Sequence, residues 1–275
     1  MTISIRLFGT LCLEYGGRTL GPRDFGGVKP KQLLELLLCE NGRPVPKDRL
    51  ADGLWGERPP RSVDATLETY VSVLRRSLGC CGWKLVVTES RAYRFAMDSV
   101  QLDVDVFDAN VALAARADTL TARIALDDAL ALAARGEFLA DEPYAEWVAS
   151  LRRHYNGKIL TALVATASAA LSLGDAGGAL MHAEAALLRD RFHEPAHRAR
   201  ILALYALSRQ HDALAAYMHC RRIFDEELGL EPMPETRALQ KAILAQADLA
   251  GLIAPPTSQT TPSRLESSDP VRLAG

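Results

Sequence analysis

The amino-acid sequence predicts a mainly α-helical protein with a small α+β domain at its N-terminus. Three observations favour this fold class. The first hundred residues mix the two-residue period of strands with the 3.6-residue period of helices, the strand signals stop near Leu102, and a helical motif then recurs after 34 residues. With 275 residues, of which 48% are hydrophobic and 24% charged, the chain is long enough for two globular domains.

The N-terminal elements follow in the order strands, helices, hairpin. The stretches ISIRLFG and LCLEYGG alternate as short strands. A first helix in KPKQLLELLLCENG has Pro30 in its first turn and Gly42 at its end, a short second helix opens at Pro46, and a third spans about 63–78. The stretch WKLVVTESRAYRFAM then predicts two strands around a polar turn at 88–91. These are the parts of a winged helix-turn-helix, which we assign to residues 1–98.

The third predicted helix has two different faces. One face is an apolar stripe, expected to be buried, that consists of Leu67, Val71, Leu74 and Leu78. The opposite face is small, polar and basic, and the hairpin turn adds an arginine that can enter the minor groove of DNA. In the major groove, hydroxyl groups can reach base edges, an exposed valine can touch a thymine methyl group, and guanidinium groups can pair with phosphate. The predicted DNA-binding residues are Arg61, Ser62, Thr66, Thr69, Tyr70, Ser72, Val73, Arg75, Arg76 and Arg91.

The distribution of charge supports this interpretation. Residues 1–100 carry 15 Lys and Arg against 11 Asp and Glu, a net charge of +4, whereas residues 101–275 carry 17 against 23, a net charge of −6. A basic first part favours contact with a polyanion. Arg75 and Arg76 alone would be weak evidence, because the helix dipole also explains cations near the C-terminus of a helix.

Residues 103–252 are predicted to form a TPR-like domain of stacked helices. LSLGDAGGAL at 171–180 aligns with YALSRQHDAL at 205–214, and this offset of 34 residues is the period of tetratricopeptide repeats. Glu194-Pro195 recurs at Glu231-Pro232 after 37 residues, so we expect irregular repeats. The expected helices, stacked as an α-solenoid, are 143–173, 176–189, 195–208, 211–228 and 234–250. Residues 254–275 are poor in apolar residues and predict a disordered tail.

Both halves resemble one known family. The stretch KPKQLLELLLCENGRPVPKDRLADGLWGERPPRSVDATLETYVSVLRRSLG resembles the OmpR-type winged helix of the Streptomyces antibiotic regulatory protein (SARP) family. LDVDVFDANV, RGEFLADEPYAEWV and the long stretch from FHEPAHRAR to TRALQKAI are similar to that family's bacterial transcriptional activator domain (BTAD). The resemblance covers about residues 3–250. The sequence departs from the family at Val73, where a basic residue is usual, and at Ala92, where a glycine usually precedes the wing tyrosine.

The resemblance implies a transcriptional activator that binds short direct repeats in promoters and helps to recruit RNA polymerase. By the same resemblance, the third helix is the recognition helix and the hairpin is the wing. The partners that it implies are double-stranded promoter DNA, RNA polymerase and a second copy of the chain on the DNA.

Other motifs do not predict catalysis. HEPAH at 193–197 matches the H-E-x-x-H pattern of zinc proteases, but Pro195 should begin a helix and leave His193 outside it. The sequence contains neither a phosphate-binding P-loop nor a G-x-S-x-G elbow. Its five cysteines, of which Cys80 and Cys81 are adjacent in a predicted turn, lack metal-site spacing. We therefore expect no enzyme, no cofactor and no metal.

The apolar runs are too short for a membrane helix, and MTISIRLFG does not resemble an export signal. We therefore expect a cytoplasmic transcriptional activator that does not contact a membrane. Two alternatives stay open. The chain could be a TPR-type interaction scaffold whose first domain docks a protein, or it could be a repressor controlled by a small ligand in the helical domain.

Overall fold

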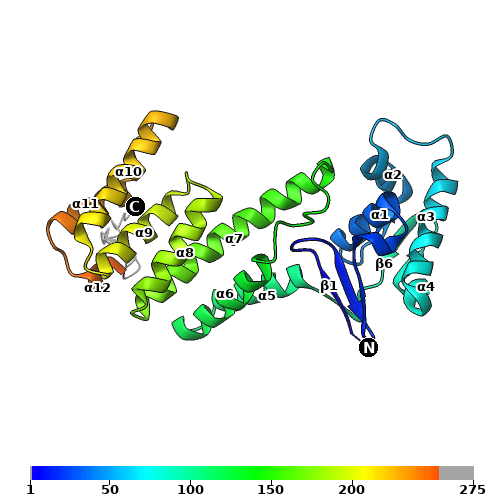
Figure 1. Cartoon of the computed structure of the whole chain (residues 1–275), viewed down its shortest axis with the longest axis horizontal. Coiled ribbons are helices and arrows are strands. Elements are labelled where there is room, and N and C mark those ends of the chain that lie inside the picture. The colour runs from blue at the N-terminus through cyan, green and yellow to red at the C-terminus, as the bar shows by residue number, and fades with distance from the viewer. Residues whose placement is uncertain (1, 254–275) are drawn as a thin grey trace, which may run out of the picture.

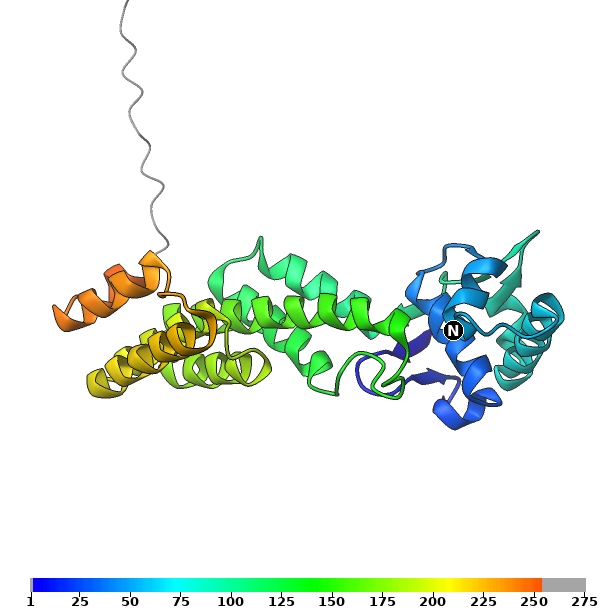
Figure 2. The same cartoon turned by 90° about the horizontal axis from the view of Figure 1, so that it is seen from above.

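The structure, a computed structural model, describes residues 2–253. Figure 1 shows an elongated molecule in which the strands and helices of residues 2–102 lie at one end and the helices of residues 103–253 extend toward the other. Figure 2, turned by 90°, shows the same arrangement. The predicted fold class is confirmed, and the tail expected at 254–275 lies outside the described residues.

A four-stranded sheet joins the beginning and the end of the N-terminal part. Its strands lie in the order β3 (Arg18–Leu20), β2 (Cys12–Tyr15), β1 (Ile3–Arg6) and β7 (Val100–Leu102). β1 pairs antiparallel with β2 and parallel with β7, and Ile5 lies opposite Leu102. β7 was not predicted as a separate strand, because its three residues form a strand only by pairing with β1, which lies almost one hundred residues earlier.

The three helices predicted for the winged helix-turn-helix are present as α1 (Val28–Cys39), α2 (Lys47–Trp55) and α3 (Val63–Ser77). The hairpin strands β5 (Val86–Thr88) and β6 (Ala92–Phe95) form a second sheet with β4 (Val45–Pro46). Three short helical turns are η1 (Pro22–Phe25), η2 (Gly79–Cys81) and α4 (Gly82–Leu85).

The predicted start of the hairpin is wrong, because the residues from Trp83 to Leu85 are helical. Here the chain packs directly on the backbone of α3. A methyl group on Gly82 would lie 2.1 Å from the carbonyl oxygen of Arg75. This tertiary contact overrides the local strand signal.

The apolar stripe of α3 is buried as predicted, with its four members between 0% and 1% exposed. It packs against α1 and α2. Burying a leucine or valine side chain stabilises a fold by roughly 1.5–3 kcal/mol, so the stripe fixes which face of α3 points outward. Tyr93 and Phe95 of β6 also point into this core, as the sequence predicts.

The second part consists of helices. They are α5 (Asp103–Ala114), α6 (Thr119–Ala133), α7 (Glu146–Ser172), α8 (Ala176–Arg189), α9 (Glu194–Ala206), α10 (Gln210–Leu228), α11 (Pro234–Leu244) and α12 (Leu249–Ile253). The helix expected at 234–250 is wrong, because α11 ends at Leu244 and Gln246 adopts a positive φ of 53°. No helix within residues 2–253 combines the length and the hydropathy that a membrane crossing requires.

The 34-residue repeat is visible in the backbone. Gly174, between α7 and α8, has a φ of 79°, and Ser208, which lies 34 residues later between α9 and α10, has a φ of 59°. The N–H groups of Asp175 and Arg209 donate to carbonyl oxygens five residues earlier, at 2.8 and 3.0 Å. The same turn recurs at Gln246, 38 residues after Ser208, so the third repeat is longer.

One hydrophobic core joins the two parts of the molecule. Phe8, which follows β1, packs with its ring centroid 5.5 Å from that of Phe107 in α5 and 5.5 Å from that of Tyr155 in α7. At the same place the buried carboxylate of Asp103 accepts hydrogen bonds from the N–H groups of Leu7, at 2.8 Å, and Phe8, at 3.1 Å. The start of the chain is therefore bound to the first helix of the second part.

We expect Asp103→Ala to lower the free energy of unfolding by about 2–4 kcal/mol, because it leaves two buried N–H groups without an acceptor. Urea denaturation measures this change. Asp105→Ala, which removes an exposed carboxylate from the same helix, is the control and should have little effect. Equal loss in both variants would contradict the assigned role of Asp103.

Candidate nucleic-acid interface

The outer face of α3 is not covered by the helical part. In Figure 1, α3 lies at the edge of the molecule that is farthest from α10 and α11, and Figure 2 shows the same segment at the same outer end. The two arginines of its last turn and the wing turn between β5 and β6 belong to the same N-terminal part.

Most of the predicted DNA-binding residues are accessible. Those on the surface are Arg61, Ser62, Thr69, Ser72, Arg76 and Arg91, whereas Thr66, Tyr70, Val73 and Arg75 are half-buried. Within residues 2–253, no carboxylate forms an ion pair with Arg61, Arg76 or Arg91. These three guanidinium groups are therefore available to an external anion.

The hydroxyl groups of α3 donate to their own helix. Thr66, Thr69 and Ser72 donate to the carbonyl oxygens four residues earlier, at 2.7, 2.8 and 2.9 Å. Each hydroxyl oxygen keeps lone pairs that can accept a hydrogen bond. This arrangement favours contact with donors, such as the amino groups of adenine and cytosine in the major groove.

Arg75 connects α3 to the wing. Its guanidinium group donates to the carbonyl oxygen of Val86, at 3.0 and 2.7 Å, and to the hydroxyl oxygen of Thr88, at 2.7 Å. The same group lies 4.1 Å from the ring centroid of Trp83, and burial lowers its pKa. Arg75 therefore holds α3 and the hairpin in a fixed relation, a role that its place in the sequence did not reveal.

Two further residues are less accessible than the sequence analysis expected. The interpretation of Val73 as an exposed residue is wrong, because its Cγ1 atom lies where a side chain on Gly26 would be, 2.3 Å from the ideal Cβ position. The ring of Tyr70 packs against Trp55, with 6.0 Å between the centroids. Tertiary packing from η1 and α2 covers this side of α3, and helical periodicity alone does not show it.

The wing is a short and well-bonded hairpin. Val86 lies opposite Phe95 and Thr88 lies opposite Tyr93, and the N–H of Glu89 donates to the carbonyl oxygen of Ala92 at 2.9 Å. Arg91 lies within this turn, directly before β6, and is exposed.

Lys47 is a functional candidate that the sequence analysis missed. Its ammonium group, at the start of α2, lies 2.9 Å from the carboxylate of Asp64 and 3.4 Å from that of Glu68. Both acids are exposed on α3 and would otherwise repel a phosphate backbone. Lys47 therefore reduces the negative potential next to the predicted interface.

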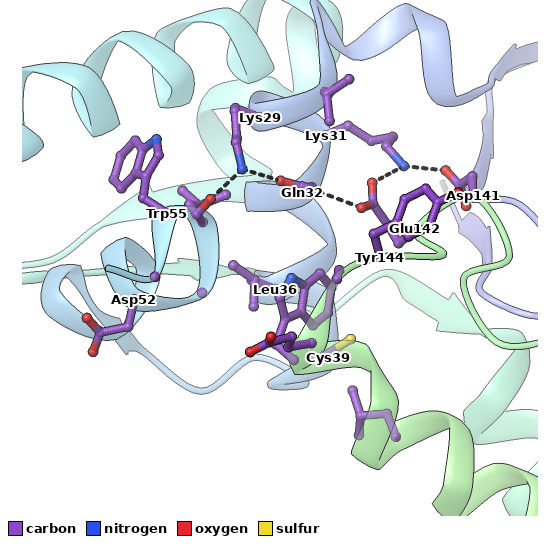
Figure 3. Close-up of a pocket in the computed structure, with 18 of the residues that line it drawn as sticks. Lys29, Lys31, Gln32, Leu36, Cys39, Asp52, Trp55, Asp141, Glu142 and Tyr144 are labelled. Atoms are coloured by element: carbon purple, nitrogen blue, oxygen red, sulfur yellow. Dashed lines mark hydrogen bonds and ion pairs between the residues drawn. The ribbon is translucent and has the colours of Figure 1, made fainter. Parts of the chain in front are cut away.

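A groove of about 1690 Å³ separates α1 and α2 from the segment that leads into α7. At its base, the buried ammonium group of Lys31 lies 3.1 Å from Glu35 and 2.5 Å from Glu142, and it also pairs with Asp141. Figure 3 shows Lys31 with Asp141 and Glu142, and the hydrogen bonds that extend from Glu142 through Gln32 to Lys29. Arg152 of α7 donates to the carbonyl oxygen of Glu142 at 3.0 Å and thus holds the same segment from the other side.

Three carboxylates of the ion cluster face one ammonium group. The carboxylates of Glu35, Asp141 and Glu142 lie close enough together to ligate a metal, but the ammonium group of Lys31 already contacts all three. Burial raises the pKa of Glu35 to about 8, and both its oxygens are buried without a hydrogen bond. Although burial alone would lower the pKa of Lys31, the carboxylates of Asp141 and Glu142 raise it above its usual value. Lys31 is therefore a cation at neutral pH.

The HEPAH stretch is not arranged as a zinc site. His193 caps α9 from outside, Pro195 stands in its first turn, and Nε2 of His197 lies 2.8 Å from the carbonyl oxygen of Arg191. The prediction that Pro195 excludes His193 from the helix is confirmed.

Both halves of the chain match known family models. Residues 27–95 match the model described as "Transcriptional regulatory protein, C terminal", and residues 102–244 match "Bacterial transcriptional activator domain". The regulatory protein DnrI of Streptomyces peucetius is 30% identical over 258 residues, which cover 88% of this chain and 92% of DnrI.

Longer relatives and a solved structure agree with this result. The regulatory protein AfsR of Streptomyces griseus is 33% identical over 82% of this chain, and the regulatory protein EmbR of Mycobacterium tuberculosis is 30% identical over 88% of it. The matched region spans only 23% of AfsR and 63% of EmbR. The structure of M. tuberculosis EmbR in complex with a low-affinity phosphopeptide has a TM-score of 0.81 and 28% identity, over 91% of this chain and 68% of that one.

We expect Arg75→Ala to lower the free energy of unfolding by about 1–3 kcal/mol, because the hydrogen bonds to β5 and the contact with Trp83 are lost. Thermal or urea denaturation measures the change. Arg76→Ala is the matched control, and we expect it to stay within about 0.5 kcal/mol of the wild type. If Arg75→Ala were as stable as Arg76→Ala, Arg75 would not anchor the wing.

The buried carboxyl group of Glu35 should make the free energy of unfolding depend on pH. Unfolded Glu35 loses its proton near pH 4.5, whereas folded Glu35 keeps it until about pH 8. Between these values the folded state binds more protons, so the contribution of Glu35 to the free energy of unfolding falls as the pH rises, by at most about 1.4 kcal/mol per pH unit. Relative to wild type, Glu35→Gln should therefore become progressively more stable between pH 5 and pH 8.

Urea denaturation at several pH values measures this difference. Glu40→Gln, at the end of the same helix but outside the ion cluster, is the control. A difference between Glu35→Gln and wild type that does not change with pH would show that Glu35 is ionised in the folded protein throughout this range.

Proposed function

The chain belongs to the SARP family of bacterial transcriptional regulators, and from this premise we propose that it is an activator that binds direct repeats in promoter DNA and recruits RNA polymerase. The observation that carries the proposal is the uncovered outer face of α3, where Arg61 and Arg76 have no acidic partner within residues 2–253. In this proposal residues 1–98 bind DNA, residues 103–252 act as the activator domain, and no catalytic step or cofactor is involved.

The proposed docking places α3 in the major groove. Thr69 and Ser72 offer hydroxyl oxygens to base edges, Arg76 pairs with phosphate, and Arg91 at the wing turn enters the adjacent minor groove. Arg61 and Ser62, at the start of α3, meet phosphate through a guanidinium group and the free N–H groups of the first turn. Thr66, Tyr70, Val73 and Arg75 are proposed to contribute from the flanks, with Arg75 mainly positioning the wing.

The second part of the chain is proposed to contact RNA polymerase or a neighbouring protomer. Head-to-tail copies on a direct repeat would lie about one helical turn, ~10–11 base pairs, apart. Asp225 and Glu226 at the end of α10 carry exposed carboxylates that fit a basic partner surface, whereas the neighbouring Glu227 pairs with Arg191. Because promoter DNA is the proposed target, we place the protein in the bacterial cytoplasm.

We expect Arg76→Ala to weaken DNA binding without changing stability. Mobility shift or fluorescence anisotropy on a fragment selected by the wild-type protein from genomic DNA measures the affinity. In a salt series, the loss of one phosphate contact should reduce the slope of log K against log salt by about 0.9. Arg237→Ala, an exposed arginine on α11, is the control and should bind like wild type.

Further measurements separate the alternatives. If the wild-type protein retained no promoter fragment at low ionic strength, the DNA-binding proposal would fail and the scaffold alternative would be favoured. Output from a promoter reporter that rises when the gene is deleted would indicate a repressor, and output that falls would support an activator.

In a selected fragment, inserting about half a helical turn between the two half-sites should abolish cooperative binding.

A further inference from the structure

Two adjacent thiols stand immediately behind the recognition helix. Cys80 and Cys81 form the η2 turn that follows α3, and their Sγ atoms lie 3.8 Å apart. Cys80 is exposed and Cys81 is half-buried, so a small reagent can reach the pair. Of the three remaining cysteines, Cys12 and Cys220 are buried and Cys39 is half-buried, so Cys80 is the exposed thiol among the five.

The geometry favours chelation over a disulfide bond. Consecutive Cα atoms are about 3.8 Å apart across a trans peptide bond, whereas disulfides usually join Cα atoms about 4.4–6.8 Å apart. A disulfide between Cys80 and Cys81 would therefore be strained. A single soft atom that bonds to both sulfurs avoids this strain, because no bond between the sulfurs is needed, and thiolates prefer such soft centres.

We propose that Cys80 and Cys81 form a dithiol site that chelates one trivalent arsenical. With an organoarsenic(III) oxide, each Sγ forms one As–S bond while both S–H bonds and the As=O bond break. The two protons and the oxygen leave as one water molecule, and no electron is transferred. The contact with Cys80 raises the pKa of Cys81, so this sulfur reacts as a thiol.

The site is connected to the predicted DNA interface through Arg75. Gly82 directly follows the two thiols and packs against the backbone of α3 at Arg75. Trp83 comes next, and its ring lies under the guanidinium group of Arg75, which also holds β5. An arsenical at the thiols therefore acts on the turn that fixes the wing relative to α3, and occupancy should weaken DNA binding. This consequence rests on the proposed function, whereas the binding site itself does not.

Phenylarsine oxide tests the site in the full chain. We expect the wild-type protein to bind one equivalent of the arsenical. The adduct should survive an excess of a monothiol and should dissociate when a competing dithiol is added. Intact mass measures the stoichiometry, and digestion followed by peptide mapping should find the arsenic on the peptide that contains both cysteines. Cys80→Ser and Cys81→Ser should each lose the monothiol-resistant adduct, and Cys39→Ser should keep it.

The proposal would be overturned if wild type formed no monothiol-resistant adduct, if the adduct mapped to another peptide, or if it persisted in both serine variants. The serine variants must show the circular dichroism spectrum of wild type, and the peptide map of wild type decides the question if they do not.

Mobility shift with loaded protein tests the connection to DNA separately. We expect affinity to fall by roughly fivefold or more in wild type, the lower range of coupling between two sites, and not in Cys80→Ser treated in the same way. Unchanged affinity of the loaded protein would overturn the connection. If the unloaded protein bound no DNA, the proposed function would fail, and the stoichiometry would still decide the arsenical site.

Discussion

A buried ammonium group determines how the two parts of this molecule meet. Lys31 of α1 has almost no contact with solvent, and removing a cation from water is costly unless carboxylates surround it. Asp141 and Glu142 supply those carboxylates from the segment before α7, and Arg152 holds the carbonyl oxygens of the same segment. The orientation of α1 relative to α7 is thereby fixed. Since α3 packs on α1, this ion cluster also helps to place α3 relative to the second part.

Two neighbouring arginines at the end of α3 point in different directions and make different contacts. Arg75 turns toward the wing, where its hydrogen bonds and its contact with Trp83 are all internal. Arg76 turns outward and has no acidic partner within the described chain. In the proposed complex, the first arginine fixes the wing and the second provides a guanidinium group for phosphate. Lys47 pairs with Asp64 and Glu68, the exposed acids of α3, and this reduces the negative potential beside the outer face of the helix.

Local patterns in the sequence predicted the elements well, and long-range contacts explain what they missed. The stripe of α3 and the exclusion of His193 from α9 by Pro195 depend on residues within a few turns of one another, the 34-residue repeat depends on a regular spacing along the chain, and all three are confirmed. The family resemblance is also confirmed. In contrast, Lys31 and Asp141 are separated by 110 residues in the chain, and the half-buried side chain of Val73 packs against the backbone at Gly26, which is distant in the sequence. Helical periodicity describes which residues share a face, but it does not describe what packs against the edges of that face.

The 27 residues of α7 form a continuous helix, which at 1.5 Å per residue is about 40 Å long. Near its first turns, Tyr155 stacks on Phe138 and packs against Phe8 beside β1, whereas its last turns contact α8 and α9. One end of α7 therefore packs beside the winged domain, and the other end packs among the helical repeats. Because α7 is one uninterrupted helix that contacts both regions, a change in the position of the distal repeats would also change the position of its first turns beside β1.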